Sequence, residues 1–492
     1  MNFPFVPPLG SLAPDSLDIA RFEASARYSP RPIPWISPLI GGSVIVLFVS
    51  LVAMAFFRQG LAAWSTGLVY IFYDTCLLAF TGWQARRLSG SGNVTPVTLA
   101  ARVGSEHRPT LTVIIAAHNE ARALAVTIDA LIAQSDPPDL ILIADDGSTD
   151  ASSDVLEGRY GLSADDPASI TSTGLHWLKL PHGGKARALN AALAHVDTDI
   201  VITVDADTLL EPHAIAAMRA HFASDVSLVA ATGVLTPVCG KSLRGRFFEW
   251  FQTYEYVRNF ISRYAWMQVN GLLLISGAFA AFRRDAVMTV GGFDPDCLVE
   301  DYELIHRLHR WSSEHHLDWR VAVIGEARAR TDAPETLMTF LRQRRRWFAG
   351  FLQTQRWNRD MTGNATFGKL GTAMMPVKAL DTLQPIYGLT AFALLIGFLA
   401  AGRYALALPI LLVMIAKIIV DLSFHMWSLG VYRGWTGDRQ SEGMGRAILS
   451  ATLEPFTFQL LRHAGAAWGW WTFLTGQQKW GRQSRGGIMA QA

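Results

Sequence analysis

An uncharged apolar run from Ile36 to Phe57 is the feature that most restricts how this chain can fold. About 20 apolar residues of helix are enough to cross the hydrocarbon core of a bilayer. A second apolar block, Trp64 to Trp83, contains one acid, Asp74, and has a tryptophan at each end, as suits a membrane interface. We therefore expect residues 36–90 to form a transmembrane helical hairpin.

The apolar pattern returns in the last quarter of the chain. Residues 376–430 hold two apolar blocks joined by a short turn whose only charged residue is Arg403, which predicts a second transmembrane hairpin. A further apolar stretch, residues 445–476, is interrupted by Glu454, Pro455, Arg462 and His463. A single crossing, a re-entrant pair and an interfacial helix are all compatible with this stretch.

The distribution of basic residues predicts the orientation of these helices. Lys and Arg are enriched in cytoplasmic segments. The connection inside the first hairpin holds one charge, Arg58, whereas its outer flanks hold Arg21, Arg27, Arg31, Arg86 and Arg87. We therefore expect residues 1–35 and the chain from residue 90 onward to the second hairpin to be cytoplasmic, in a multi-pass membrane protein. The basic tail, residues 477–492, favours a cytoplasmic C-terminus.

Residues 100–360 have the pattern of a cytoplasmic α/β domain, with short apolar runs between polar turns and helical stretches. In open α/β sheets, ligands bind just beyond the carboxyl ends of the strands. Aromatic and basic stretches near 243–270 and 336–357 predict helices that lie at the membrane surface. Three strand-like runs each end in a polar cluster: Thr112 to Ala117, Leu140 to Ala144, and Ile200 to Val204.

The overall charge gives no reason to expect a nucleic-acid partner. Forty-three Lys and Arg residues against 41 Asp and Glu residues leave a formal net charge of +2. Cys76, Cys239 and Cys297 lie far apart in no metal-binding or redox spacing, so we expect reduced thiols.

Two acidic motifs follow strand-like runs. Asp145 and Asp146 precede Gly147, which allows a sharp turn. Asp205 and Asp207 are alternate carboxylates that can share one hard divalent cation, Mg²⁺ or Mn²⁺, with phosphate oxygens. Either motif alone is also common in solvated surface turns.

Three further motifs have a chemical and a structural interpretation. Lys185 follows Gly183 and Gly184 at an apparent helix start, which can hold an anion or simply end a turn. Glu300 and Asp301 open another helical stretch, where a carboxylate can also serve as a cap. The motif Gln343-Arg344-Arg345-Arg346-Trp347 lies in a basic segment that can face lipid headgroups.

In order and spacing, these five motifs resemble those of the processive membrane family 2 glycosyltransferases. This group includes the cellulose, hyaluronan, chitin-oligosaccharide and poly-N-acetylglucosamine synthases. Its first strand ends in an Asn-Glu element, which is Asn119-Glu120 here, and Gln343, Arg346 and Trp347 match its last motif. The stretch Ser276 to Arg284 is most similar to the poly-N-acetylglucosamine branch.

The chain departs from this group's usual pattern at two positions. Ala116 stands where proline is usual in the first motif, and Val299 where threonine usually precedes the acid pair. Neither change removes a titrating group, so the implied chemistry is retained.

The resemblance implies an α/β GT-A (Rossmann-like) cytoplasmic domain and an α-helical transmembrane bundle with interfacial helices. It implies an inverting, Mg²⁺- or Mn²⁺-dependent enzyme that polymerises a β-linked polysaccharide from a UDP-sugar, UDP-N-acetylglucosamine as first choice and UDP-glucose as second. Its partners would be that donor, the growing polysaccharide, the lipid bilayer and accessory export subunits. The product would cross the membrane through the enzyme's own helices, where Lys417 and Asp421, one turn apart, can pair with each other or face a wet path.

The same resemblance implies a role for each motif residue. Asp301 would be the catalytic base, with Glu300 beside it. Gln343 and Trp347 would bind the acceptor, and Asp205 and Asp207 would bind the metal. The donor would contact Glu120, Asp145, Asp146, Lys185, Asp205 and Arg346.

Two other functions remain open on the sequence. A non-processive transferase that adds one sugar to a lipid acceptor would have the same donor motifs. A non-catalytic scaffold of a polysaccharide export machine would have the same hairpins, although the intact acids Asp205, Asp207 and Asp301 argue against it.

Overall fold

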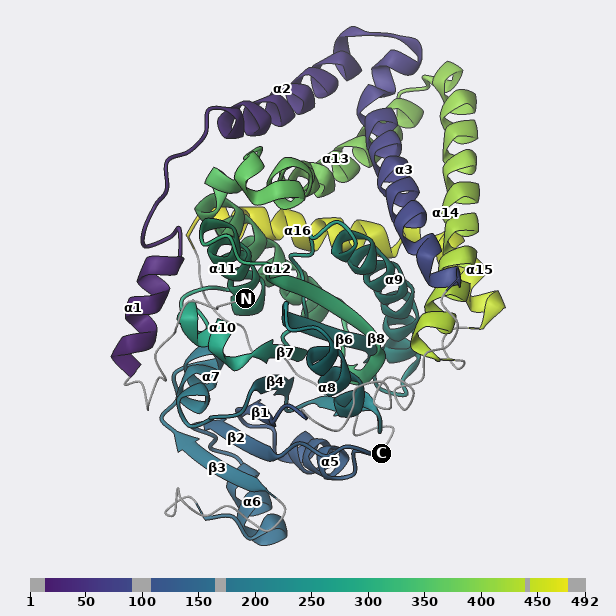
Figure 1. The fold of residues 1–492 in the computed structure, drawn as a ribbon. Helices are drawn as coiled ribbons and strands as arrows, with labels where there is room; N and C mark the ends of the chain where they lie inside the picture. Colours follow the sequence, from purple (N-terminus) through teal and green to yellow (C-terminus); the bar gives the residue numbers. More distant parts are fainter. Residues whose placement is uncertain (1–13, 91–107, 164–173, 439–442, 477–492) are drawn as a thin grey trace.

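The computed structural model describes residues 14–90, 108–163, 174–438 and 443–476 (Figure 1). The predicted basic tail, residues 477–492, lies outside the described residues, as do residues 1–13 of the predicted N-terminal segment. The described part has an α/β domain on one side and long apolar helices on the other, and helices α9, α12 and α16 lie between them.

The α/β domain is built on one sheet of eight strands in the order β3-β2-β1-β4-β7-β6-β8-β5. Strands β3, β2, β1 and β4 are parallel, whereas β7 runs antiparallel to both β4 and β6. The strands are β1 (Leu111–Ala117), β2 (Leu140–Asp146), β3 (Leu175–Leu180), β4 (Ile200–Asp205), β5 (Thr208–Leu210), β6 (Leu228–Val238), β7 (Phe279–Arg283) and β8 (Arg320–Asp332).

The central strands are buried on both faces, because helices cover the sheet on its two sides. In β1, six of the seven residues are buried, and alternation of apolar and polar residues is accordingly absent. The helices of this domain are α5 (Ala121–Ile132), α6 (Ser152–Tyr160), α7 (Lys185–Ala194), α8 (Ala214–Ser224), α10 (Arg284–Thr289) and α11 (Glu300–Glu314). Helices α7 and α11 begin at two of the predicted site motifs.

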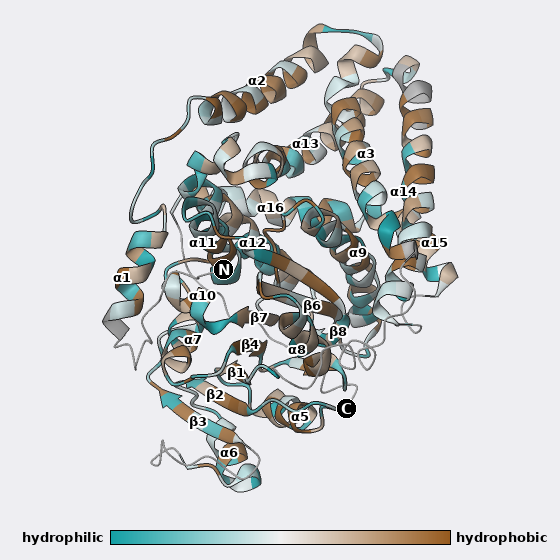
Figure 2. Cartoon of the chain, viewed as in Figure 1, coloured by the Kyte–Doolittle hydropathy of each residue, from teal (hydrophilic) through white to brown (hydrophobic). Residues whose placement is uncertain are grey.

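Four helical segments among the described residues are long and apolar enough to cross a membrane. Their helices are α2 (Ile36–Phe57), α3 (Ser65–Ala85), α13 (Met375–Ala400) and α14 (Ala407–Thr436). Brown, apolar residues dominate α2, α3 and α14 in Figure 2. Large apolar side chains such as Val46, Phe72 and Ile419 are exposed on them, as expected of surfaces that face lipid.

The helices between the two parts are α9 (Leu243–Met267), α12 (Leu337–Trp357), α15 (Met444–Leu453) and α16 (Phe458–Leu474). Helix α9 packs against β6 and β8 on one side and α3 and α14 on the other. Helix α16 lies along α12. The two helices approach closely at Gly465 and Gly469, where a side chain would collide with α12. The stretch 445–476 is thus two helices, separated at Glu454 and Pro455.

A buried ion pair fastens α11 to the segment that follows α12. Arg310 has no exposed surface, and its two terminal nitrogens donate to the two carboxylate oxygens of Asp360 at 2.7 and 2.8 Å. Asn358 accepts a further bond from the same guanidinium at 2.9 Å. Such paired, forked geometry satisfies charges that would be costly to bury alone.

Arg310→Ala should destabilise the protein by about 3–5 kcal/mol, because it leaves the Asp360 carboxylate buried and unpaired. The double variant Arg310→Met/Asp360→Leu, which buries no charge, should recover much of this loss. Thermal unfolding of the detergent-solubilised protein measures both. If Arg310→Ala unfolds at the same temperature as the unaltered protein, the ion pair does not stabilise the fold.

Candidate active site

Four of the motifs predicted from the sequence converge on one cavity of about 650 Å³ beside the sheet. They reach it from the end of β4, the starts of α7 and α11, and the middle of α12. Eight predicted site residues line it: Lys185, Asp205, Asp207, Glu300, Asp301, Gln343, Arg346 and Trp347. Glu120, Asp145 and Asp146 do not line this cavity and lie at the ends of the neighbouring strands β1 and β2.

Lys185 is the cation at the centre of the acidic residues. Its Nζ lies 2.5 Å from Asp205 and 3.7 Å from Glu300, and it donates to the backbone oxygen of Gly277 at 3.4 Å. Burial by itself would lower the pKa of Lys185, but the negative charges of Asp205, Glu300 and Asp301 outweigh it and raise the pKa above its ordinary value. Lys185 therefore remains protonated at neutral pH and offsets the repulsion among these acids.

Asp301 is oriented by two backbone N–H groups. Its Oδ2 accepts from Gly277 at 2.7 Å and its Oδ1 accepts from Tyr302 at 2.8 Å. A Cβ at position 277 would lie 2.9 Å from Asp301 Oδ2, so only glycine allows this approach. Beside it, burial and the charge of Asp301 raise the pKa of Glu300, and Lys185 opposes part of this shift.

The carboxylate of Asp146, at the end of β2, holds the turn that leads into α7. Its oxygens accept from the backbone N–H groups of Gly183 at 2.7 Å and Gly184 at 3.0 Å. Gly147 has φ +67°, and a side chain there would meet the backbone nitrogen of His182 at 2.7 Å. Asp146 is therefore linked to Lys185 through this turn, although it does not line the cavity.

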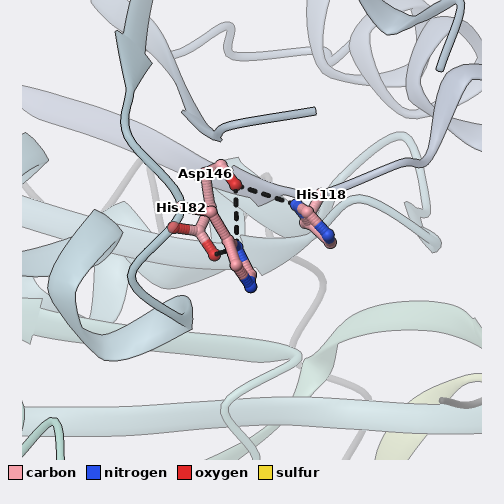
Figure 3. A group of neighbouring side chains, drawn as sticks. All are labelled: His118, Asp146 and His182. Carbon is pink, nitrogen blue, oxygen red and sulfur yellow. Dashed lines mark hydrogen bonds and ion pairs between the residues drawn. The ribbon is translucent and has the colours of Figure 1, made fainter. Parts of the chain in front are cut away.

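Two histidines flank Asp146, and sequence reasoning did not identify either of them as a site residue. Nδ1 of His182 lies 2.9 Å from Asp146 Oδ2, and Nδ1 of His118 lies 2.8 Å from its backbone oxygen (Figure 3). The two imidazole rings stack with their centroids 4.3 Å apart. One ligand atom from each of the three residues lies within 4.8 Å of the others, so this group has the chemistry to hold a metal ion.

Asn119 and Asp145 hold the loop beside the predicted donor residue Glu120. Asn119 has φ +57°, and its side-chain oxygen accepts from the backbone nitrogens of Thr149 at 2.7 Å and Asp150 at 3.1 Å. Glu120, the next residue, is half-buried at the start of α5. Asp145 is buried and accepts from the backbone nitrogen of Ser148 at 2.9 Å. These bonds tie the end of β1 to the loop after β2.

On α12, the predicted acceptor residues share the cavity with Arg344, to which the resemblance assigned no role. Arg346 donates to the backbone oxygen of Leu298 at 3.3 Å. Arg344 forms a forked, buried ion pair with Glu255 of α9 at 2.7 and 2.8 Å, and its guanidinium lies 4.5 Å from the ring centre of Trp347. This stacking helps to fix the Trp347 ring at the cavity wall.

The cavity continues from Trp347 into the membrane helices, where charged residues line it, among them Asp74, Lys417 and Asp421. Lys417 Nζ lies 2.7 Å from Asp74 of α3 and also contacts Asp421. Arg258 of α9 lies 3.3 Å from Asp421. Lys417 and Asp421 thus pair with each other, as one of the two alternatives predicted, and both line the cavity.

The donor set around Asp205 and Asp207 fits a hard cation. Both carboxylates line the same cavity as Asp332, and Asp207 is almost fully buried. A set of carboxylate oxygens is the ligand chemistry that Mg²⁺ and Mn²⁺ prefer, and it leaves room for phosphate oxygens. Of the described residues, these are the ones in the cavity best suited to hold such an ion.

Comparison with known proteins identifies similar glycosyltransferases. The family described as "Glycosyl transferase family group 2" matches residues 200–419. A poly-beta-1,6-N-acetyl-D-glucosamine synthase of Staphylococcus epidermidis is 26% identical over 52% of this chain and 58% of its own length. One of the same name from Staphylococcus aureus is 28% identical over 49% of this chain and 54% of its own. The chain thus spans a little over half the length of these relatives.

A solved structure shares the fold. The mannosyltransferase PcManGT of Pyrobaculum calidifontis, in complex with GDP-Man and Mn²⁺, covers 80% of this chain and 99% of its own with a TM-score of 0.52 and 20% identity. This likeness confirms the predicted fold, a GT-A domain combined with helices that are long and apolar enough to span a membrane. The α/β domain therefore has the GT-A fold of glycosyltransferases, and residues 200–419 match the glycosyl transferase family group 2.

Proposed function

We propose that this chain is an inverting, metal-dependent polysaccharide synthase that polymerises a UDP-sugar and moves the product across the membrane through its own helices. The observation that carries the proposal is the continuity of one cavity. It begins at Lys185 and Asp205, passes Asp301 and Trp347, and reaches Lys417 between the membrane helices. A site for a single transfer to a lipid needs no charged path into the helix bundle.

The choice of sugar donor rests on the names of the similar proteins. Those from S. epidermidis and S. aureus are named poly-beta-1,6-N-acetyl-D-glucosamine synthases, which supports UDP-N-acetylglucosamine as the first donor to test and UDP-glucose as the second. The structural neighbour from P. calidifontis was solved with GDP-Man, so a GDP-sugar belongs in the same panel.

Asp205 and Asp207 are the residues we assign to the metal. When bound, Mg²⁺ or Mn²⁺ would neutralise negative charge on the departing diphosphate. Mn²⁺ in the neighbour from P. calidifontis supports this assignment. Asp207 would be the main ligand of the metal, because Asp205 already pairs with Lys185 at 2.5 Å.

The transfer step needs only a base and charge stabilisation. Asp301 takes the proton from the acceptor hydroxyl, whose oxygen then bonds to the anomeric carbon as the bond from that carbon to the UDP oxygen breaks. Attack opposite the leaving group inverts the configuration at that carbon. The protonated Lys185, near Asp205 and Glu300, and the guanidinium of Arg346 stabilise the diphosphate as it leaves.

The acceptor end of the sugar chain would rest against α12. Trp347 offers a flat apolar face to a sugar ring, and Gln343 offers an amide to its hydroxyls. The bonds that hold Arg344 to Glu255 keep this wall fixed relative to α9. Asp146, Asp145 and Glu120 would bind the uridine side of the donor.

The proposed setting is a bacterial-type inner membrane with the GT-A domain in the cytoplasm, where nucleotide sugars are made. The bilayer surrounds the four apolar helices. Accessory export subunits would receive the product on the other side of the membrane.

A test incubates the full chain, purified in detergent with Mg²⁺ or Mn²⁺, with single UDP-sugars and GDP-Man. We expect release of UDP and a product of many sugars, because the cavity can lead the chain already made away from the donor site while its growing end stays beside Trp347. Product size and nucleotide release are measured together, and a chelator should stop both.

The alternatives give other results in the same assay. A lipid that carries one added sugar would identify a non-processive transferase. No nucleotide release from any donor would favour a non-catalytic scaffold. Activity that persists unchanged in chelator would show that the transfer does not depend on a metal ion.

Asp301→Asn should lower the transfer rate by a factor on the order of 10² to 10⁴, because the amide cannot accept the acceptor proton. UDP binding should stay close to that of the unaltered chain, since the donor residues are intact. Calorimetric binding of UDP is the control for folding. A variant with near-normal turnover would exclude Asp301 as the base.

Lys185→Met should move the acid limb of the activity profile to higher pH. Without the cation, burial and the charge of Asp301 raise the pKa of Glu300 further, so Glu300 takes up a proton at a higher pH. Lys185→Arg retains the charge and should keep the limb near its original position. UDP release across the acid and neutral range measures the profile, and a limb that stays in place in Lys185→Met would refute this role.

A further inference from the structure

The segment before the first membrane helix is bound to the GT-A domain. Helix α1 (Pro14–Ala24) and the turns after it, residues 14–31, are here called the N-terminal strap. Helix α1 contacts α7, α10 and α11 of the GT-A domain (Figure 1). The arginines of the strap, which the sequence suggested only as signals of orientation, make most of its polar contacts.

Arg21 is the deepest contact of the strap. It is 5% exposed, and its Nη1 donates to the backbone oxygens of Phe293 at 3.2 Å and Gly291 at 3.4 Å. A side chain at Gly291 would collide with the backbone nitrogen of Arg21. Gly291 also has φ +82°, so glycine serves both the turn and the close approach of the two segments.

Arg27 supplies the charge partner of a fully buried acid. Its Nη1 lies 3.0 and 3.2 Å from the two carboxylate oxygens of Asp294, which has no exposed surface. The guanidinium also lies 4.7 Å from the ring centre of Trp357, at the end of α12. A buried carboxylate is costly without such a partner.

The loop that the strap grips, residues 291–298, leads directly into Glu300 and Asp301. Asn190 of α7 clamps the same loop, since it donates to the backbone oxygen of Phe293 at 2.8 Å and accepts from its nitrogen at 2.7 Å. Arg346 of α12 contacts the loop at Leu298. The helices that present Lys185, Asp301 and Trp347 therefore all meet at this loop.

We propose that the N-terminal strap is a positioning element of the active site. Arg21 and Arg27 hold the 291–298 loop, and the loop holds the start of α11 so that Asp301 faces the cavity. Ser37 of α2 donates to the backbone oxygen of Arg359 at 2.6 Å, so the strap continues into a membrane helix that is itself tied to the GT-A domain. This inference rests on the proposed function, in which Asp301 is the base.

The test compares Arg21→Ala and Arg27→Gln with the unaltered full chain in detergent. A misplacement of about 1 Å at a reacting group can cost up to about a hundredfold in rate, so we expect kcat to fall about tenfold or more. The KM for the UDP-sugar should change little, because the donor acids on β2 and β4 do not touch the strap. Arg27→Lys keeps the charge beside Asp294 and should recover part of the lost kcat.

Arg31→Ala is the matched control. Arg31 belongs to the same strap but pairs with Glu314, at the far end of α11, at 3.1 Å. The Arg31→Ala substitution should leave kcat unchanged. A loss in Arg31→Ala equal to that in Arg21→Ala would mean that the strap only stabilises the fold, and this would overturn the positioning role.

Hydrogen exchange of the purified chains gives a readout that does not require activity. Arg21→Ala and Arg27→Gln should speed deuterium uptake over residues 290–301 and leave β1 unchanged. Unaltered uptake together with unaltered kcat would overturn the inference. If the unaltered chain releases no nucleotide from any donor, the proposed function fails, and the exchange result alone then decides whether the strap holds the loop.

Discussion

The neutralisation of clustered carboxylates by Lys185 is the interaction on which the site depends. Asp205 and Glu300 come from separate parts of the chain, and both lie within 4 Å of Lys185 Nζ. Buried carboxylates at such spacing repel one another unless a cation lies among them. The turn into α7 places that cation, and Asp146 holds the turn through two backbone N–H groups. With a divalent cation on Asp205 and Asp207, as proposed, this site would suit the charge of a diphosphate.

Buried charge also organises the boundary between the GT-A domain and the membrane helices. Arg344 and Glu255 join α12 to α9, and Arg258 joins α9 to Asp421 of α14. These contacts lie along the wall of the same cavity. Ion pairs satisfy these charges in a low-dielectric setting and leave polar groups facing the cavity, a lining that would suit the hydroxylated polymer of the proposed function.

The sequence allowed much of the fold and the main acids to be predicted. Strand ends at Asp146 and Asp205 carry functional groups because parallel strands present their carboxyl ends at one edge of the sheet. Contacts between distant segments could not be predicted from the sequence. Nothing in the spacing of Arg21 and Asp294, or of His118 and His182, indicates that they meet, since such pairings depend on how the elements pack. Asp74 gave a partial indication of its contact with Lys417, because a lone acid in an apolar block needs a partner.

The most direct test of the continuous cavity is photo-crosslinking of the product during synthesis. A photoreactive residue at position 418 of α14 lines the cavity, whereas one at position 419 lies on the exposed outer side of the same helix. With a radiolabelled UDP-sugar, elongated glycan should crosslink at 418 and not at 419, and only after several rounds of addition. Polymer synthesis without any crosslink at 418 would contradict the account.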